Sequence, residues 1–413
     1  WERLYVVYEV ITEREEDVAR KVTNLLTMGE IAENRVGRAL TGFECYGKAF
    51  TTDPLNHEAL DRIEHLAAAH EMWENVPALM LQGAKAIEGN PESLALRLRA
   101  AAVQRDKVVD REAAALTLEG VIEDFPDNRD ALSALDALYL QMEQWKDLAR
   151  VLRAEIDASP AAEDKVAFLL RLAAVADDRQ GKDKDAFEAR CEVLYLVPAH
   201  PGAVSELRRM FDAGKMRAQI LEVIEPIYRE TGSWTDLATV YESVLAAVED
   251  PGERKSVLLK LGEVELDKLQ RRDVALGWFG KALAIEPADE SLLIQIEGLA
   301  AEAGEWASLL EILLAAATTC QEDERRIYLW HKAADVARDR LGDRQRAEAV
   351  CRWILDVDAS DRKALADLDG LYEGQERWAD LLGILEREAV VADYDDDKIR
   401  FGMRAGALLR DRL

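Results

Sequence analysis

Proline, glycine and cysteine are all scarce in this sequence. Its 413 residues include 10 prolines and 23 glycines, while 49% of residues are apolar and 32% are charged. Few helix-breaking residues in so apolar a chain favour packed helices and exclude disorder. The cysteines show no CxxC spacing, which excludes a disulfide framework. Three of them occupy nearly the same place in the repeat described below, so we expect buried free thiols at Cys45, Cys191, Cys320 and Cys351.

Basic residues are also in short supply. The chain has 53 Lys and Arg against 81 Asp and Glu, a formal charge of −28, and the excess of acid is spread along its length. Nucleic acid or an anionic membrane would require a basic surface, so neither is expected as a direct partner. No apolar run approaches the roughly 18 residues of a membrane span. Free cysteines favour the cytoplasm, although a periplasmic protein would show the same features.

Tryptophan marks a long internal repeat. Six Trp residues, each followed three residues later by Leu or Val, are separated by 72, 72, 89, 72 and 72 residues: Trp1, Trp73, Trp145, Trp234, Trp306 and Trp378. A fixed period is typical of a stacked array in which each unit contacts its neighbours. The sequence begins at Trp1 in the middle of this pattern and without methionine, so we expect a fragment of a longer protein.

Each 72-residue unit is predicted to contain four helices, or two hairpins of about 36 residues. The first helix starts at the Trp, as in Trp145, Leu148 and Val151. The second carries an apolar stripe, the third is rich in alanine and ends near a proline, and the fourth ends in a pair such as Leu138-Tyr139. One hairpin cannot cover its own apolar face, so neighbouring hairpins must stack. The fold class expected is an all-α solenoid.

At this point the sequence resembles the tetratricopeptide repeat family, most of all bacterial proteins with long arrays. The family pattern of Leu-Gly followed by Ala, an aromatic residue, Ala and Pro is matched by Leu261, Gly262, Ala275, Phe279, Ala282 and Pro287, and by Met28, Gly29, Tyr46, Ala49 and Pro54. The hairpins that contain a Trp match it only loosely. The resemblance implies a right-handed superhelix whose concave face, lined by the first helix of each hairpin, binds peptides or protein surfaces.

The interval of 89 residues predicts an irregularity. The extra stretch 217–233 aligns with the Trp helix at its start, through Ile220 and Ile224, and with the Leu-Tyr helix at its end, through Ile227 and Tyr228. We interpret it as a copy of the unit reduced to one helix. Because an odd helix disturbs the alternation of layers, a kink is expected near 214–234, aided by Pro226. The expected organisation is three units in 1–216, the remnant 217–233, and two units plus a truncated third in 234–413.

Two columns of charge appear when the units are aligned. Twenty-six residues after the second to sixth Trp the chain has a basic residue: Arg99, Arg171, Lys260, Lys332 and Arg404. One hypothesis is a ladder of cations that grips acidic groups of a partner along the concave groove; the other is a lattice of salt bridges between repeats. Thirty-four residues after every Trp comes another basic residue, preceded by Asp in five units, at the expected end of a helix. There it would complement the helix dipole, and the recurring Asp would need a fixed hydrogen bond to a nearby turn or Arg.

No pattern in the sequence points to catalysis, a cofactor or a metal. His65 and His70 are five residues apart, whereas a helical zinc site needs a spacing of four, and the sequence DYDDD at 393–397 lacks the pattern of a calcium loop. Gly-rich phosphate loops and nucleophile elbows are absent. The function expected is therefore a non-enzymatic scaffold that binds a protein or peptide within a larger assembly, with the partner and the oligomeric state unread.

Two alternatives stay open. The sequence WERLYVVYE near the start resembles the half-a-tetratricopeptide repeats of RNA-processing assemblies, and WTDLATVYE at 234–242 is similar. The array could equally be the docking or regulatory region of a larger enzyme.

Overall fold

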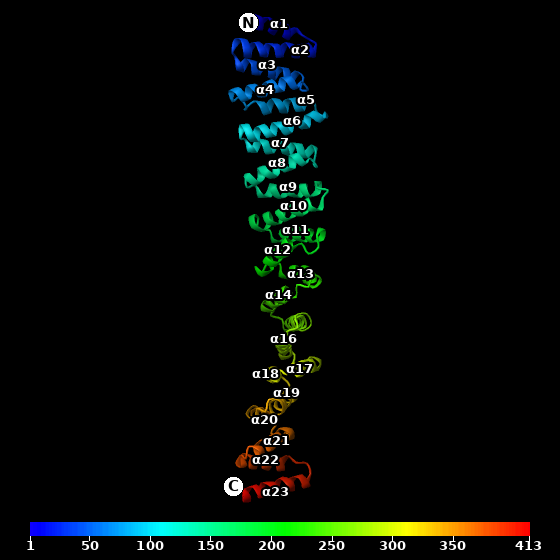
Figure 1. Cartoon of the computed structure of the whole chain (residues 1–413), viewed down its shortest axis with the longest axis vertical. Helices are drawn as coiled ribbons and strands as arrows, with labels where there is room; N and C mark the ends of the chain where they lie inside the picture. The colour runs from blue at the N-terminus through cyan, green and yellow to red at the C-terminus, as the bar shows by residue number, and fades with distance from the viewer. The chain divides into compact units, whose positions relative to one another are not determined.

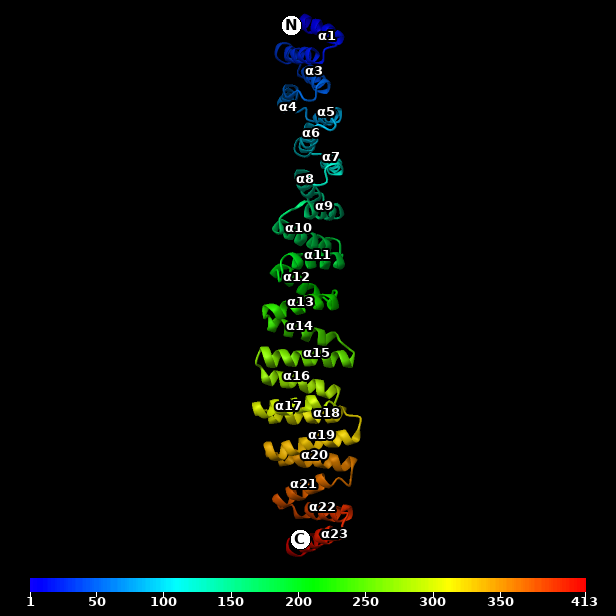
Figure 2. The same cartoon turned by 90° about the vertical axis from the view of Figure 1, so that its right-hand side faces the viewer.

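The structure is a computed structural model that describes all 413 residues, and it is built entirely of helices. It contains 23 α-helices and five short π-helical turns, with no strand. The chain divides into two compact parts, Trp1–Ile220 and Leu221–Leu413, here named the N-terminal and C-terminal arrays. Within each array the helices follow one another as a stack (Figures 1 and 2). The expected all-α solenoid of helical hairpins is confirmed.

Twelve helices belong to the N-terminal array: α1 (Glu2–Arg14), α2 (Val18–Glu30), α3 (Ala39–Thr52), α4 (His57–His70), α5 (Val76–Ala86), α6 (Pro91–Val103), α7 (Arg111–Asp124), α8 (Arg129–Gln141), α9 (Trp145–Ala158), α10 (Ala162–Ala174), α11 (Asp183–Leu196) and α12 (Pro201–Asp212). Helix α13 (Arg217–Thr231) contains the point of division. Ten helices follow in the C-terminal array: α14 (Trp234–Ala247), α15 (Pro251–Glu263), α16 (Arg272–Ile285), α17 (Glu290–Ala303), α18 (Trp306–Thr319), α19 (Asp323–Asp335), α20 (Arg344–Val357), α21 (Arg362–Gly374), α22 (Trp378–Val391) and α23 (Asp395–Asp411).

The helices alternate between two kinds. We name the first helix of each hairpin helix A and the second helix B, so that α8 and α10 are A helices while α9 and α11 are B helices. Consecutive helices pack in pairs within both arrays, and two B helices also contact the next B helix, α3 with α5 and α16 with α18. Most of the buried residues are apolar, for example Leu148, Val151 and Leu152 on α9, each fully buried. Burial of these faces between neighbouring hairpins holds the stack together.

Four of the six Trp helices begin at the Trp, as predicted. The exception that departs most is α5, which begins at Val76, three residues after Trp73. Pro77 explains this difference, because proline has no N–H to donate and is favoured in the first turn of a helix. Trp73 therefore lies in the turn before the helix, and the prediction that every such helix starts at its Trp is wrong for this unit.

Small residues allow helix A and helix B to approach closely. A Cβ atom placed on Gly262 would lie 2.4 Å from the ring of Phe279, and one on Gly29 would lie 2.4 Å from Tyr46. Both aromatic rings are almost completely buried. The glycine and the aromatic residue of the repeat pattern are thus the two sides of one contact between α15 and α16, or between α2 and α3. Where the repeat at Trp73 has Leu118 in place of the aromatic residue, it has Ala101 in place of glycine.

A π-helical turn follows helix A in five hairpins. These turns span Ile31–Val36, Gln104–Val108, Val175–Arg179, Val264–Lys268 and Val336–Arg340. Each contains the second column of charge, that is, the residues 33 and 34 positions after the Trp. The π turn has more residues per turn than an α-helix, so a separation of seven residues here does not correspond to two α-helical turns. The second column therefore lies on a π turn in these hairpins, while the first lies on the regular part of helix A.

Helix α13 is bounded by two turns of the same kind. The backbone N–H of Lys215 donates to the carbonyl of Met210 at 3.0 Å, and the N–H of Ser233 donates to that of Tyr228 at 2.9 Å. Both bonds join residues five apart after a glycine with positive φ, which is the Schellman ending of a helix. The same bond joins Gln144 to Tyr139 in the turn from α8 to α9. Helix α13 thus begins as a helix B and ends as a helix A, while the kink at 214–234 stays a prediction.

The cysteines form no disulfide. Cys45, Cys320 and Cys351 are buried, which confirms the expected buried thiols, whereas Cys191 is partly exposed. No helix is long and apolar enough to cross a membrane.

Candidate partner-binding site

The basic column lies on A helices, and every member contacts an acidic residue 35 positions earlier in the chain. The acid belongs to the preceding helix A, so each pair connects two neighbouring hairpins. The pairs are Arg99–Glu64 (2.6 Å), Arg171–Asp136 (2.7 Å), Lys260–Glu225 (3.5 Å), Lys332–Glu297 (2.7 Å) and Arg404–Asp369 (2.5 Å). The column is therefore a ladder of cations that already have anionic partners.

The contact of Arg171 with Asp136 shows how well these pairs fit. Both terminal nitrogens of the guanidinium donate to the two carboxylate oxygens at 2.7 Å. Asp136 is buried, and Arg171 keeps 41% of its side chain exposed. The hydrogen bond to Asp136 raises the pKa of Arg171. Two parallel charge-assisted bonds of this kind fix the geometry as well as the charge.

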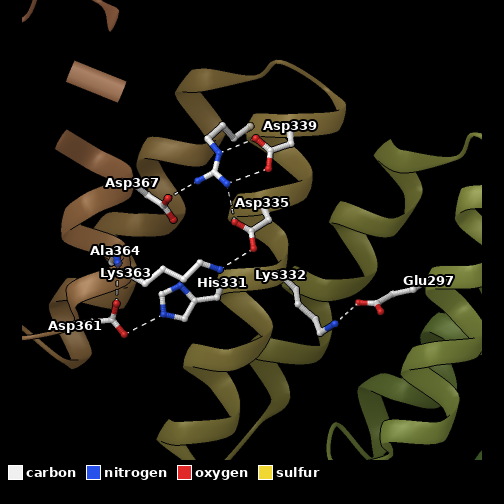
Figure 3. Close-up of polar contacts among 10 residues, drawn as sticks. Glu297, His331, Lys332, Asp335, Asp339, Asp361, Lys363, Ala364 and Asp367 are labelled. Atoms are coloured by element: carbon white, nitrogen blue, oxygen red, sulfur yellow. Dashed lines mark hydrogen bonds and ion pairs between the residues drawn. The ribbon is translucent and has the colours of Figure 1, made fainter. Parts of the chain in front are cut away.

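Lysine members of the column pair in the same way. Figure 3 shows Lys332 reaching Glu297, with the two side chains coming from neighbouring helices. Burial is the largest effect on the pKa of Lys332 and lowers it, but the hydrogen bond and charge of Glu297 together with Tyr328 outweigh burial, and the net change is a rise. Lys332 is thus charged at any physiological pH. An acidic partner would have to share it with Glu297.

Acidic residues on the facing helices were missed in the sequence. All five anionic partners of the column lie nine residues before a Trp: Glu64, Asp136, Glu225, Glu297 and Asp369. The sequence therefore contained the signal, an acid that recurs in register with a base. Reading it required the knowledge that two A helices 35 residues apart face each other. A role of the column in binding a partner stays a prediction.

A second set of contacts joins each tryptophan to the cation 34 residues later. The charged group lies over the indole ring in all six repeats: Arg35 over Trp1, Lys107 over Trp73, Arg179 over Trp145, Lys268 over Trp234, Arg340 over Trp306 and Arg412 over Trp378, at 4.7 to 5.6 Å from the ring centroid. Such cation–π contacts stabilise an exposed pair by roughly 0.5–1 kcal/mol. The basic residue thus has a specific aromatic partner, beyond the helix dipole that the sequence indicated.

The aspartate before that cation has a local partner. Asp106, Asp339 and Asp411 each bond the arginine directly before them in the chain, for instance Arg105 to Asp106 at 2.7 and 2.8 Å. These bonds lower the pKa of all three carboxyl groups. The expected bond to an Arg is present in these repeats, but it comes from the adjacent residue. The Asp therefore stabilises its own turn.

A denser network surrounds the last turn of α19 (Figure 3). Arg338 bonds Asp335 and Asp339 and also reaches Asp367 on α21. Burial raises the pKa of Asp367 despite this contact. His331 lies 2.9 Å from Asp361 at the start of the same helix α21. The network fixes α21 to α19, and no group of three or more His, Cys, Asp or Glu side chains is placed to hold a metal ion.

Comparison with known families agrees with this geometry. Residues 221–255 match the model of the tetratricopeptide repeat. This part of the chain is similar to the tetratricopeptide repeat. The matched segment covers the second half of α13 and all of α14, a hairpin that contains a Trp. The resemblance in the sequence is carried by other hairpins, 28–54 and 261–287, whereas the family model matches a hairpin that contains a Trp.

Three solved structures are similar to the chain at low sequence identity, and two of them are described as tetratricopeptide repeat structures. One from Parabacteroides merdae is 12% identical over 67% of this chain and 98% of its own, with a TM-score of 0.26. The Cut9–Hcn1 hetero-tetramer of the APC/C is 15% identical over 95% and 77%, with a TM-score of 0.24. The P58(IPK) repeat domain is 13% identical over 94% and 98%, with a TM-score of 0.21. No curated protein sequence matches the chain.

Proposed function

We propose that this helical repeat protein is a non-catalytic scaffold that binds a protein or peptide along its A helices, within a larger assembly. The observation that carries the proposal is the row of A helices, held in register by one ion pair in each repeat from the second to the sixth. Rigid rows of this kind present side chains at fixed intervals, which suits the recognition of an extended partner. No covalent chemistry is needed, because binding depends on shape and charge.

Site-specific photo-crosslinking tests the proposal. Ala167 on α10 and Ser256 on α15 occupy the same repeat position, are exposed, and lie one helical turn before Arg171 and Lys260. A photoreactive amino acid placed at either position is expected to crosslink the same cellular partner, because both positions lie on the proposed binding face.

Two positions on B helices provide the control. Tyr195 on α11 and Lys281 on α16 are exposed on the other helix of the same hairpins. The same photoreactive group at these positions is expected to give no such product. Crosslinks that arise from the B helices alone, or equally from both kinds of helix, would contradict binding along the A helices.

A further inference from the structure

Two pockets are formed by the same repeat positions, one in each array. The first has a volume of about 370 Å³ and lies among α8, α9 and α10; the second, of about 240 Å³, lies among α21, α22 and α23. Five matching residues line them, each at the same distance from its Trp: Arg129, Leu132, Glu155, Asp164 and Phe168 in the first, and Arg362, Leu365, Glu388, Asp397 and Phe401 in the second. The match sets these two repeats apart from the other four.

A buried glutamate is the distinctive member of each pocket. Glu155 and Glu388 are each only 7% exposed, and one carboxylate oxygen of each, Oε2, has no hydrogen-bond partner. The other four repeats have Ile11, Gly83, Val244 and Ala316 at this position. Packing of the hairpins therefore does not need a carboxyl group there. Burying an unpaired one costs free energy, so its presence in both pockets calls for a ligand that satisfies it.

Nearby cations do not satisfy these carboxyl groups, because other acids hold them. Arg171 on α10 bonds Asp136 on α8, and Arg404 on α23 bonds Asp369 on α21. Burial, followed by the charge of Asp136, raises the pKa of Glu155 to about 7 despite the opposing effect of Arg171.

The second pocket repeats this arrangement of charge. Burial and Asp369 raise the pKa of Glu388 to about 7, against Arg404 and Arg400. Each buried glutamate therefore titrates near neutral pH.

The rim of each pocket carries one further cation and one further acid. Arg129 donates to the carbonyl of Ala158 at 3.4 Å, and Arg362 donates to that of Val391 at 3.3 Å. Arg362 also pairs with Asp393, and Asp397 pairs with Arg400 at 3.0 Å. Asp164 is exposed at the rim of the first pocket. The rim cations are thus directed to the backbone or to rim acids, and the unsatisfied group inside is the glutamate.

We propose that each pocket receives one lysine side chain of the bound protein, with its ammonium group on the buried glutamate and its aliphatic stem along the leucine and phenylalanine. The inference rests on the proposed scaffold function and adds the chemistry of the partner. A lysine ammonium is a compact cation on a flexible apolar stem, and it suits one free carboxylate oxygen beside Leu132 and Phe168 better than the planar fork of arginine does. The strongly acidic chain also favours a basic partner.

Carboxyl NMR of the full chain tests the proposal directly. Glutamate labelled with ¹³C at the side-chain carboxyl gives one resonance for each residue, and the Glu155→Gln and Glu388→Gln variants assign the two of interest. N-acetyl-lysine N-methylamide is the probe, and the norleucine analogue, which lacks the ammonium group, is its control. The lysine probe is expected to shift both resonances saturably and to lower their titration midpoints from near neutral pH, because the bound cation favours the ionised carboxylate.

The glutamine variants separate the two pockets. Glu155→Gln is expected to weaken binding in the first pocket by roughly tenfold or more and leave the response of Glu388 unchanged, and Glu388→Gln should do the reverse. Glu163→Gln, at an exposed position on α10, is the matched control and should change neither. Glutamine keeps the shape without a charge to bury, so thermal unfolding should show folded variants that are at least as stable.

Three results would overturn the proposal: resonances that do not move, equal effects of the norleucine probe, or midpoints that rise. A rise would mean that a protonated glutamate donates to a carbonyl of the ligand. Failure of the scaffold function is recognised separately. If the lysine probe does not bind but the A-helix crosslinks form, the proposed scaffold function is supported and the lysine pockets are contradicted. If the probe binds but the crosslinks do not form, the lysine pockets are supported and the scaffold function is contradicted.

Discussion

Two sets of charged residues contact partners that lie 34 or 35 positions away in the sequence. A cation on helix A faces an acid on the previous helix A, and a cation after helix A covers the Trp of its own repeat. A separation of 34 or 35 residues is about the length of one hairpin, so these contacts join helices that are neighbours in the stack. The cations of these two sets thus find their partners on a neighbouring helix rather than on their own.

Reversing and then exchanging charges in the ladder separates stability from binding. Lys332→Glu combined with Lys260→Glu places two acids opposite Glu297 and Glu225, so we expect a loss of roughly 1 kcal/mol at each pair and a lower melting temperature. Adding Glu297→Lys and Glu225→Lys restores both pairs with the opposite polarity and should restore stability. Thermal unfolding followed by circular dichroism measures both steps.

The exchanged variant also tests whether the basic column binds a partner. If the column binds acidic groups of the partner, charge reversal will weaken the A-helix crosslinks, and the exchange will not restore them, because the cations have moved to the neighbouring helix. The size of this loss will depend on the salt concentration. If crosslinking recovers together with stability, the ladder serves only to connect the repeats.

Helix A and helix B of a hairpin can make their close contact through either of two residue combinations. The hairpin of α15 and α16 uses glycine with a large ring, Gly262 with Phe279, and the hairpin of α6 and α7 uses Ala101 with Leu118. The two residues of either choice must change together. A Cβ beside an unmoved aromatic ring has no room, since interiors are close-packed.

Gly262→Ala is therefore expected to destabilise the C-terminal array by roughly 1–3 kcal/mol through overpacking against Phe279. Phe279→Leu alone should also destabilise, because it leaves a cavity. The double variant reproduces the combination found in the repeat at Trp73. It should therefore lose less unfolding free energy than the sum of the losses of the two single variants. Urea unfolding of all four proteins measures this coupling, and additive losses would contradict the paired contact.

At the scale of the whole molecule, α13 decides whether the alternation of A and B helices continues. It enters through the turn that normally precedes a helix B and leaves through the turn that normally follows a helix A. One helix therefore takes two successive places in the order of the array. The irregular interval of 89 residues is compatible with a folded chain because each end of α13 satisfies a different neighbour.

Deletion of residues 217–233 should leave a folded protein, because α12 would then be followed by α14 as an A helix is followed by a B helix. The variant is expected to keep its helical content per residue and a cooperative urea transition. Deletion of residues 183–199 is the control of equal length: it removes α11, leaves two A helices in succession, and should abolish cooperative unfolding of the N-terminal array. Equal behaviour of the two deletions would contradict the double role of α13.

The amino-acid sequence by itself determined the period, the helix content and the hairpin pattern. The register of the six tryptophans and the helical spacing of the apolar residues can be read directly from the sequence, because both reflect the local geometry of helices. The Gly262 and Phe279 positions were likewise visible as a family pattern, although their mutual contact was not. Pro77, which explains why α5 begins three residues after its Trp, was also visible in the sequence, but the regular spacing of the tryptophans led to the prediction of a helix start at Trp73.

Tertiary structure alone decided which charges meet. The pairing of Arg171 with Asp136, the cation over each Trp and the unsatisfied oxygen of Glu155 depend on how helices 34 to 35 residues apart are rotated against each other, and π turns alter that rotation. Helix propensity and hydrophobic period say which face is buried, but they do not fix the angle at which two stacked faces present their polar edges. The fold could therefore be read from the sequence, whereas the two glutamate pockets became visible only when the repeats were stacked.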